Sequence, residues 1–160
     1  MIKAVLPGSF DPPTNGHINI IERAAAIFDT VDVVISVNTN KKYLFSAEER
    51  FEMLDELTKV YHNVSVHLWN KLIVDYAKNV GATVLVRGVR AFTDFGYEFE
   101  LSMLNKDLDP DIETIFLPTD PKYFVLRSSA IKELTILNSD ISKMVPSLVE
   151  VALRDKLLGS

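Results

Sequence analysis

The hydrophobic positions of this chain fall into short apolar runs, and longer segments with helical spacing separate these runs. Several runs are almost continuously apolar and rich in β-branched residues, which is typical of strands that are covered on both faces of a sheet. The runs predict strands at Ile2–Leu6, Val31–Val37, Val64–Leu68, Thr83–Val86 and Glu113–Leu117.

Helix signals fill the segments between the predicted strands. Ser46-Ala-Glu-Glu49 has the pattern of a capping box, in which the serine accepts from a first-turn amide and the glutamate reaches back. Gly81 is typical of a helix end, and Pro146 is favoured in a first turn. The predicted helices cover residues 17–28, a segment that follows Ser46, residues 71–80, residues 94 to about 108 with Asp94 as the cap, and two segments from Ser128 onward.

Strands that alternate with helices predict a mostly parallel sheet with right-handed crossovers. The fold class is therefore α/β, a doubly wound five-stranded parallel sheet with a C-terminal helical segment. A length of 160 residues indicates a single domain, residues 1–160. In such sheets ligands bind beyond the carboxyl ends of the strands, where the direction of winding reverses. Candidate functional residues are therefore expected just after the strands.

Composition and charge exclude several classes of function. The chain has no cysteine, which excludes a disulfide framework, thiolate metal sites and thiol catalysis. Its net charge of -5 argues against a large nonspecific nucleic-acid surface. The apolar stretch at the N-terminus is too short for a signal peptide, and no run approaches the length that crosses a bilayer. We therefore expect a soluble, cytoplasmic protein with neither nucleic acid nor membrane as a partner.

A long loop, PGSFDPPTNG (residues 7–16), joins the first predicted strand to the next helix. Most such connections take about 2–6 residues, so a loop of this length indicates a function. Gly8 and Gly16 would let a ligand approach the backbone, and the free amides at the start of the helix favour a phosphate. His17 would lie beside such an anion, although a histidine at a helix start is more often a surface or capping residue.

Basic and hydroxyl side chains follow other predicted strands. Lys41 and Lys42 come after the second strand, where a solvated loop is the simpler interpretation. Arg87 directly follows an apolar run, so its charge requires a partner. Ser128 and Ser129 open a helix, where they would either bind phosphate or cap the helix.

The string GSFDPPTNGH (8–17) resembles the signature of nucleotidyltransferases that carry Thr/His-x-Gly-His after the first strand. The whole chain is more closely similar to the phosphopantetheine adenylyltransferase family, through NTNKK (38–42), FSAEER (45–50) and VRGVRAFTDFGYE (86–98). The resemblance implies a Rossmann-like nucleotidyltransferase domain that serves coenzyme A synthesis. It implies reversible transfer of the adenylyl group of ATP to 4′-phosphopantetheine by direct in-line attack, which gives dephospho-coenzyme A and pyrophosphate.

The same resemblance implies which residues form the site. His17, Thr14 and Lys41 would be catalytic, with His17 as a hydrogen-bond donor to the α-phosphate, and no residue is assigned as a metal ligand. The acceptor would contact Ser9, Lys41, Leu72, Ile73 and Arg87. ATP would contact Ser9, Phe10, His17, Gly88, Val89, Arg90, Glu98, Tyr123, Phe124, Val125, Leu126, Arg127, Ser128 and Ser129.

The resemblance further implies Mg²⁺ with ATP, coenzyme A as a feedback inhibitor and a homohexamer, although the residues alone do not determine the oligomeric state. Arg127 stands where the family usually has serine, so it either points to solvent or adds a phosphate contact. By pattern alone, Glu98 would also suit an ordinary helix face, and Leu72 and Ile73 would suit the core side of a helix.

Two other functions compete with this interpretation. A sibling transferase would share the loop and His17 but act on nicotinate mononucleotide or a phosphorylated alcohol. Such an enzyme has no need for Lys41, Arg87 and Arg90 in this arrangement. A nucleotide-binding module without turnover would explain the fold and the phosphate loops, but it does not explain the acceptor-side cations Lys41 and Arg87. The motifs therefore favour adenylyl transfer to phosphopantetheine.

Overall fold

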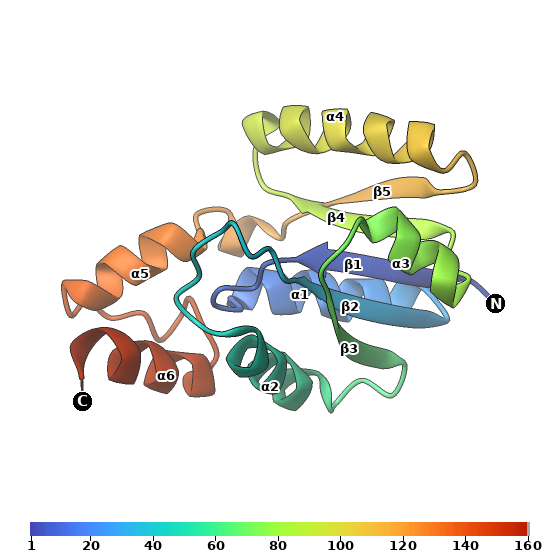
Figure 1. Cartoon of the computed structure of the whole chain (residues 1–160). Helices are drawn as coiled ribbons and strands as arrows, with labels where there is room; N and C mark the ends of the chain where they lie inside the picture. Colours follow the sequence, from blue (N-terminus) through green and yellow to red (C-terminus); the bar gives the residue numbers. More distant parts are fainter. Residues whose placement is uncertain (160) are drawn as a thin grey trace.

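The computed structural model describes residues 1–159, and Ser160, the last residue of the predicted domain, lies outside this part. Strands and helices alternate as far as the fifth strand, as the apolar pattern predicted (Figure 1). The strands are β1 (Lys3–Gly8), β2 (Thr30–Ser36), β3 (Val64–Trp69), β4 (Val84–Val89) and β5 (Glu113–Pro118). The helices are α1 (Asn15–Ile27), α2 (Ala47–Thr58), α3 (Ile73–Val80), α4 (Phe92–Leu108), the short 3-10 helix η1 (Pro121–Tyr123), α5 (Ser128–Ile136) and α6 (Ser147–Leu158).

The strands form one parallel sheet in the order β3-β2-β1-β4-β5. This order confirms the predicted doubly wound α/β fold with a C-terminal helical segment. The chain winds in one direction from β1 to β3 and in the other from β4 to β5. The direction therefore reverses between β1 and β4, which is the place where doubly wound sheets bind their ligands.

Alternating side chains of each strand serve the two faces of the sheet. On one face, α1 and α2 pack against a cluster that includes Ala4 and Leu6 of β1. On the other face, α3 contributes Ala77 to a cluster with Val5 of β1. Figure 1 shows α3 in front of the sheet and α1 behind it. A third cluster joins α5 and α6 to Phe45, so the C-terminal helices pack against the segment that precedes α2.

The two central strands separate toward their carboxyl ends. Within residues 1–159, β1 pairs with β4 at Ala4 and Val5 alone, whereas it pairs with β2 along its whole length. The backbone at Leu6–Gly8 thus turns away from β4. Nη1 of Arg87 donates to the carbonyl oxygen of Pro7 at 2.8 Å and bridges the gap. This separation opens the crevice that the reversal of winding predicts.

Two predictions about element ends were wrong. β4 pairs with β5 as far as Val89, so the strand continues beyond its predicted end at Val86 and includes Arg87–Val89. α4 begins at Phe92, so Asp94 lies in its first turn and does not cap it. Asp94 instead forms an ion pair with Arg90, at 3.3 Å. The error in β4 arose because pairing with β5, a partner distant in the sequence, extends the strand.

Most predicted helix ends are confirmed. Ser46 caps α2 in the predicted capping box, whereas α1 begins at Asn15, two residues before its predicted start, with Thr14 as its cap. Gly81 ends α3 with a left-handed backbone at φ 70°, which glycine adopts without steric cost. α5 begins at Ser128, but the hydroxyl of Ser128 donates to the carbonyl oxygen of Pro12 at 3.2 Å and does not cap the helix.

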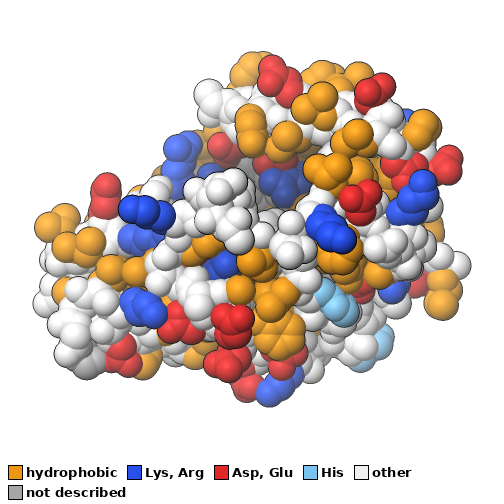
Figure 2. Space-filling view, viewed as in Figure 1, with side chains coloured by type: hydrophobic (Ala, Val, Ile, Leu, Met, Phe, Trp, Pro, Cys, Tyr) orange, Lys and Arg blue, Asp and Glu red, His pale blue; other side chains and the backbone are white. Residues whose placement is uncertain are grey.

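The surface carries an apolar stretch along α4, visible in Figure 2 at the top of the molecule. None of the residues of this helix is buried within the described chain. Phe92, Tyr97, Leu104 and Leu108 are each more than half exposed. An exposed apolar face of this kind marks an interaction surface. It is not a membrane span, since none of the helices within residues 1–159 has the length and apolar character that a bilayer requires.

Candidate active site

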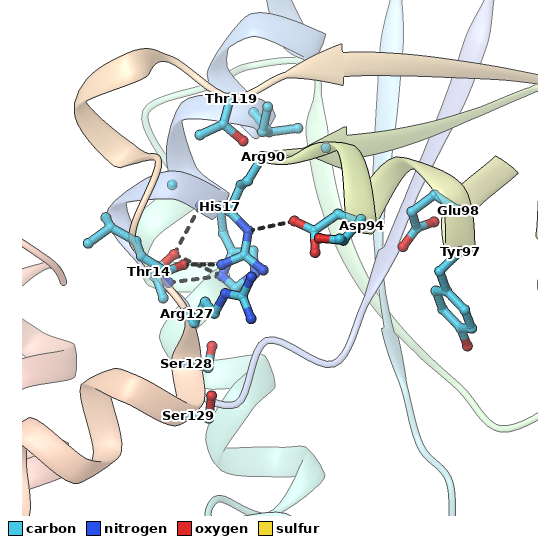
Figure 3. A pocket seen from close by; sticks show the side chains of 15 residues that line it. Thr14, His17, Arg90, Asp94, Tyr97, Glu98, Thr119, Arg127, Ser128 and Ser129 are labelled. Carbon is cyan, nitrogen blue, oxygen red and sulfur yellow. Dashed lines mark hydrogen bonds and ion pairs between the residues drawn. The ribbon is translucent and has the colours of Figure 1, made fainter.

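Two cavities open at the carboxyl edge of the sheet. The first has a volume of about 630 Å³ and lies between the start of α1, the end of β4 and the starts of α4 and α5 (Figure 3). Its volume is in the usual range for a ligand pocket. Its walls include Thr14, Gly16, His17, Gly88, Arg90, Thr93, Asp94, Tyr97, Glu98, Thr119, Leu126, Arg127, Ser128 and Ser129.

The second cavity has a volume of about 1110 Å³ and lies on the other side of β1, between the loop after β2, α3 and α4. Tyr97 and Glu98 line both cavities, so the first turns of α4 form their shared boundary. Figure 2 shows a hollow beneath α4 with basic atoms at its floor. The walls of the second cavity include Ser9, Asn38, Lys41, Trp69, Leu72, Ile73, Arg87, Leu101 and Asn105.

His17 lies in the first turn of α1, and its ring is fixed from two sides. The amide N–H of Thr14 donates to Nδ1 of His17 at 3.0 Å, and the Thr14 hydroxyl lies 3.2 Å from the same nitrogen. The ring of Phe10 meets the imidazole edge-on, with the centroids 5.0 Å apart. Because Nδ1 accepts from a backbone amide, the neutral imidazole carries its proton on Nε2. His17 can therefore offer an N–H to an anion.

Burial and nearby positive charge keep His17 neutral. Desolvation is the largest cause, followed by the guanidinium groups of Arg90 and Arg87, and together they lower the pKa of His17 from 6.5 to about 4. An imidazole with this pKa is almost entirely neutral near pH 7. His17 is therefore available as a neutral hydrogen-bond donor, and the positive charge around the cavities comes from arginine and lysine.

Arg90 follows β4 and joins two walls of the first cavity. Its Nη1 donates to the carbonyl oxygen of Leu126 at 2.8 Å, and its Nε pairs with Asp94 at 3.3 Å. Arg127 lines the same cavity from the start of α5, and its side chain is exposed (Figure 3). The cavity thus presents two guanidinium groups and the neutral N–H of His17, a set that suits a ligand with several negative charges.

Arg87 and Glu98 form a bidentate ion pair at the boundary between the cavities. Nε and Nη2 of Arg87 donate to the two carboxylate oxygens at 2.6 and 2.7 Å, and Nη1 donates to Pro7. A guanidinium has five N–H donors, so Arg87 keeps an N–H on each terminal nitrogen for a further acceptor. A phosphate bound there would also lie near Glu98. The ion pair is therefore expected to loosen when an anion enters the second cavity.

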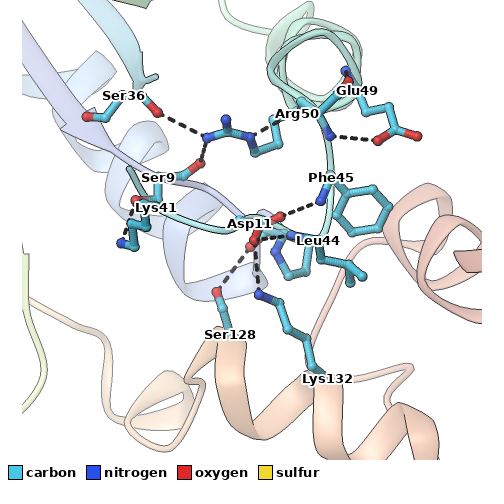
Figure 4. Close-up of polar contacts among 12 residues, drawn as sticks. Ser9, Asp11, Ser36, Lys41, Leu44, Phe45, Glu49, Arg50, Ser128 and Lys132 are labelled. Atoms are coloured by element: carbon cyan, nitrogen blue, oxygen red, sulfur yellow. Dashed lines mark hydrogen bonds and ion pairs between the residues drawn. The ribbon is translucent and has the colours of Figure 1, made fainter. Parts of the chain in front are cut away.

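Lys41 reaches the second cavity from the loop after β2, and its Nζ lies 3.4 Å from the Ser9 hydroxyl. Asp11 connects this loop to its neighbours (Figure 4). Its buried carboxylate accepts from the amides of residues 44 and 45 at 2.8 and 2.9 Å and from Nζ of Lys132 on α5 at 3.0 Å. Asp11 thus joins the segment before α1 to the lysine loop and to α5.

The structure brings most of the sequence-predicted site residues to these cavities. All predicted acceptor contacts line the second cavity, namely Ser9, Lys41, Leu72, Ile73 and Arg87. The predicted residues that line the first are Thr14, His17, Gly88, Arg90, Glu98, Leu126, Arg127, Ser128 and Ser129. Among residues 1–159, the predicted ATP contacts that line neither cavity are Phe10, Val89, Tyr123, Phe124 and Val125.

The exceptions other than Val89 have physical causes. Phe10 buries its ring in the sheet core, with its backbone at φ 49°. An added Cβ at Gly8 would come within 2.9 Å of that ring, so the absence of a side chain at Gly8 makes room for Phe10, while Gly8 itself lines the second cavity. Tyr123 packs against the C-terminal cluster, while Phe124 and Val125 point to solvent.

Sequence reasoning missed several residues of the cavity walls. Thr119 lines the first cavity and directly follows the end of β5, so the rule that pointed to the ends of strands would have found it. Thr93 and Tyr97 lie one turn apart on α4, and both face the same cavity. Asn105 lies two turns further along this helix, at the second cavity. Helical spacing from Thr93 would have linked these positions.

Comparison with known proteins identifies the family. Residues 5–134 match the cytidylyltransferase-like family model. A phosphopantetheine adenylyltransferase of Caldanaerobacter subterraneus subsp. tengcongensis is 46% identical over 157 residues, which are 98% of each chain. Another, of Dictyoglomus thermophilum, is 47% identical over 156 residues, which are 98% of this chain and 95% of the relative. The chain belongs to the phosphopantetheine adenylyltransferase family. Its resemblance to that family, first drawn from the motifs, is thereby confirmed.

Membership of the phosphopantetheine adenylyltransferase family makes the chain an enzyme, a nucleotidyltransferase of coenzyme A biosynthesis. A crystal structure from Vibrio parahaemolyticus, provisionally assigned as a nicotinate-nucleotide adenylyltransferase, has a TM-score of 0.71 at 21% identity. It covers 98% of this chain and 95% of its own. A likeness at this identity supports the Rossmann-like nucleotidyltransferase fold and says nothing of the acceptor.

Proposed function

We propose that the enzyme transfers the adenylyl group of ATP to 4′-phosphopantetheine and releases pyrophosphate, in the step that makes dephospho-coenzyme A. The reaction would be reversible and would take place where the two cavities meet, within a single nucleotidyltransferase domain formed by residues 1–160. One observation carries the proposal. In a member of this family, the neutral donor His17 and the cations Lys41 and Arg87 lie at two adjoining cavities.

ATP would occupy the first cavity. Nε2–H of His17 would donate to the α-phosphate, and Arg90 and Arg127 would neutralise the β- and γ-phosphates. The N-terminal ends of α1 and α5 both line this cavity, and helix N-termini favour negative charge. Thr14 would act through its hydrogen bond to Nδ1, since this bond keeps the proton on the nitrogen that faces the phosphate.

Phosphopantetheine would occupy the second cavity. Its phosphate would lie near Lys41, Arg87 and the Ser9 hydroxyl, and its apolar arm would follow the start of α3. Leu72 is 56% exposed in the free chain, so a ligand arm would bury apolar surface there. Two cations at this end would offset the repulsion between two anionic reactants.

The chemistry then requires alignment and charge neutralisation more than a protein nucleophile. An oxygen of the acceptor phosphate attacks the α-phosphorus, a new P–O bond forms, and the bond to the leaving pyrophosphate breaks. The donor on His17 strengthens its hydrogen bond as negative charge builds on the α-phosphate. Removing a donor of this kind commonly lowers the rate by about 10²–10³.

Magnesium would enter with ATP. The first cavity offers oxygen groups that suit this hard cation, namely the carboxylate of Asp94 and the hydroxyls of Thr119 and Ser129. These groups would face the ion through few direct bonds, because magnesium usually retains waters and phosphate oxygens. When bound, it supplies positive charge to the leaving pyrophosphate.

Self-association into a homohexamer is part of the proposal, and the exposed apolar face of α4 supports it. Leu104 is 60% exposed on this helix. A Leu104→Glu substitution should lower the sedimenting mass in analytical ultracentrifugation, and an unchanged hexamer would exclude α4 from the contact.

Coenzyme A would inhibit by occupying the second cavity, since it shares the pantetheine arm. A cytoplasmic location fits an enzyme that consumes ATP.

The acceptor is tested by following pyrophosphate release from Mg-ATP with one acceptor at a time. We expect release with 4′-phosphopantetheine and dephospho-coenzyme A in the mass spectrum. Release with nicotinate mononucleotide but not with 4′-phosphopantetheine would identify a sibling transferase. ATP binding without product from any acceptor would identify a nucleotide-binding module. His17→Ala is the control, and it should lose most turnover while its fold stays intact.

A further inference from the structure

Arg50 is a buried cation in the first turn of α2 that the proposed reaction does not use. Its side chain is among the largest fully buried ones, and the residue is 1% exposed. A guanidinium stays charged in proteins, and burying it is costly unless its donors are bonded. No ion pair within residues 1–159 includes Arg50. Its charge is therefore stabilised by neutral groups.

Nε and Nη1 of Arg50 donate to the backbone carbonyl oxygens of three serines (Figure 4). Nη1 donates to Ser9 at 2.8 Å and to Ser36 at 3.2 Å, and Nε donates to Ser46 at 3.3 Å. The ring of Tyr43 lies over the guanidinium, with 3.9 Å from Cζ to the ring centroid. Such a stack adds a cation–π attraction.

These contacts hold both ends of the loop that carries Lys41. Ser36 is the last residue of β2, and Ser46 is the N-cap of α2, so one guanidinium binds the loop where it begins and where it ends. Residues 38–42 at the tip are all exposed and have little packing of their own. The position of the tip therefore depends on its base.

The same guanidinium fixes the group that faces Lys41. Nζ of Lys41 lies 3.4 Å from the hydroxyl of Ser9, and the carbonyl of that serine is the nearest acceptor of Arg50. The loop after β1 and the loop after β2 are thus bound to a single rigid side chain. A fork of planar donors can reach several carbonyls at once, which a lysine ammonium on a flexible stem does not reproduce.

We propose that Arg50 is a positioning residue for the acceptor phosphate, and that it acts by holding the loop between Ser36 and Ser46 so that Lys41 stands beside Ser9. This inference rests on the proposed function, because it takes 4′-phosphopantetheine as the ligand of the second cavity. Arg50 does not itself line that cavity within the described chain. Its effect on the acceptor therefore passes through Lys41.

The test compares Arg50→Lys with the parent, using isothermal titration of full-length protein with 4′-phosphopantetheine and, separately, with ATP. Kd for 4′-phosphopantetheine should rise about tenfold or more, while Kd for ATP changes by less than about twofold. Leu54→Val, one turn further on the buried face of α2, is the matched control. It should lower Tm without changing either Kd. Equal shifts for both ligands, or none, would overturn the proposal.

A double-mutant cycle shows whether the effect passes through Lys41. In a Lys41→Ala background, Arg50→Lys should cause no further loss of acceptor affinity, and additive losses would contradict the proposal. If Arg50→Lys does not fold, Tyr43→Leu and Tyr43→Phe replace it. Both remove the hydroxyl, but only leucine removes the ring over the guanidinium, so only leucine should weaken acceptor binding. Equal acceptor affinity in the two variants would refute the role.

Measurements on the parent enzyme distinguish a failure of this inference from a failure of the proposed function. A parent that neither binds nor adenylylates 4′-phosphopantetheine refutes the proposed function. A parent that does both, together with an Arg50→Lys variant that keeps the parental Kd, refutes only the role of Arg50.

Discussion

Replacing His17 by glutamine should make the stability of the enzyme less dependent on pH. Histidine in the unfolded chain has a pKa of 6.5, and in the folded chain burial and two arginines lower the pKa of His17 to about 4. Between these values the unfolded chain holds a proton that the folded chain does not. Acidification therefore favours unfolding, and stability is lost as the pH falls from 6.5 toward 4.

The magnitude follows from the shift of the pKa. Each unit corresponds to about 1.4 kcal/mol, so His17 should cost the native state roughly 2 kcal/mol at pH 5 and roughly 3 kcal/mol at pH 4. Glutamine has no proton to gain and can still accept from the amide of Thr14. The free energy of unfolding of the parent, relative to that of His17→Gln, should therefore fall by about 2 kcal/mol between pH 7.5 and pH 5.

Urea denaturation of both proteins at these two pH values measures this change, in a buffer without phosphate, so that no anion enters the cavity. His62→Gln provides the control for the loss of a histidine at an exposed position, since His62 lies on the segment after α2. Parallel stability profiles for the parent and His17→Gln would refute the claim that His17 is neutral and desolvated.

Three further substitutions probe the rest of the site. Lys41→Ala should raise the Kd for 4′-phosphopantetheine about tenfold or more and change the Kd for ATP by less than about twofold. An equal rise of both Kd values in isothermal titration would contradict an acceptor-side role. Arg127→Ser should raise the Kd for ATP by about three- to tenfold at low salt and by a smaller factor at high salt. An unchanged Kd would show that Arg127 points only to solvent. Gly88→Ala should lower the free energy of unfolding by about 1–3 kcal/mol, because the added Cβ would lie 3.1 Å from Cγ1 of Ile20 on α1. Urea denaturation that leaves this free energy unchanged would show that α1 adjusts without cost.

Local sequence signals were sufficient for the sheet and for the helix ends they encode. The apolar runs placed all of the strands, because strands covered on both faces need continuous apolar sequence. The capping box at Ser46 and the stop at Gly81 depend on neighbouring residues alone, so they could be read directly. The reversal of winding between β1 and β4 then placed His17 and Arg90 at one edge.

Contacts between distant segments could not be predicted in this way. The carboxylate of Glu98 binds Arg87 because α4 folds back over β4, and no spacing in the sequence encodes that meeting. The carboxylate of Asp11 is held by a loop and a helix from other parts of the chain. The resemblance to a family supplied Phe10 as an ATP contact, but no local pattern shows that its ring lies in the core, in the space that Gly8 leaves.

The stereochemical course at the α-phosphorus tests most directly whether the adenylyl group passes straight from ATP to the acceptor beside His17. A single diastereomer of ATP with sulfur on the α-phosphate would be turned over with 4′-phosphopantetheine, and the configuration of the product determined. One direct displacement predicts inversion. Retention would require two displacements through a nucleotide bound covalently to the enzyme, and it would contradict the role of His17 as a neutral hydrogen-bond donor.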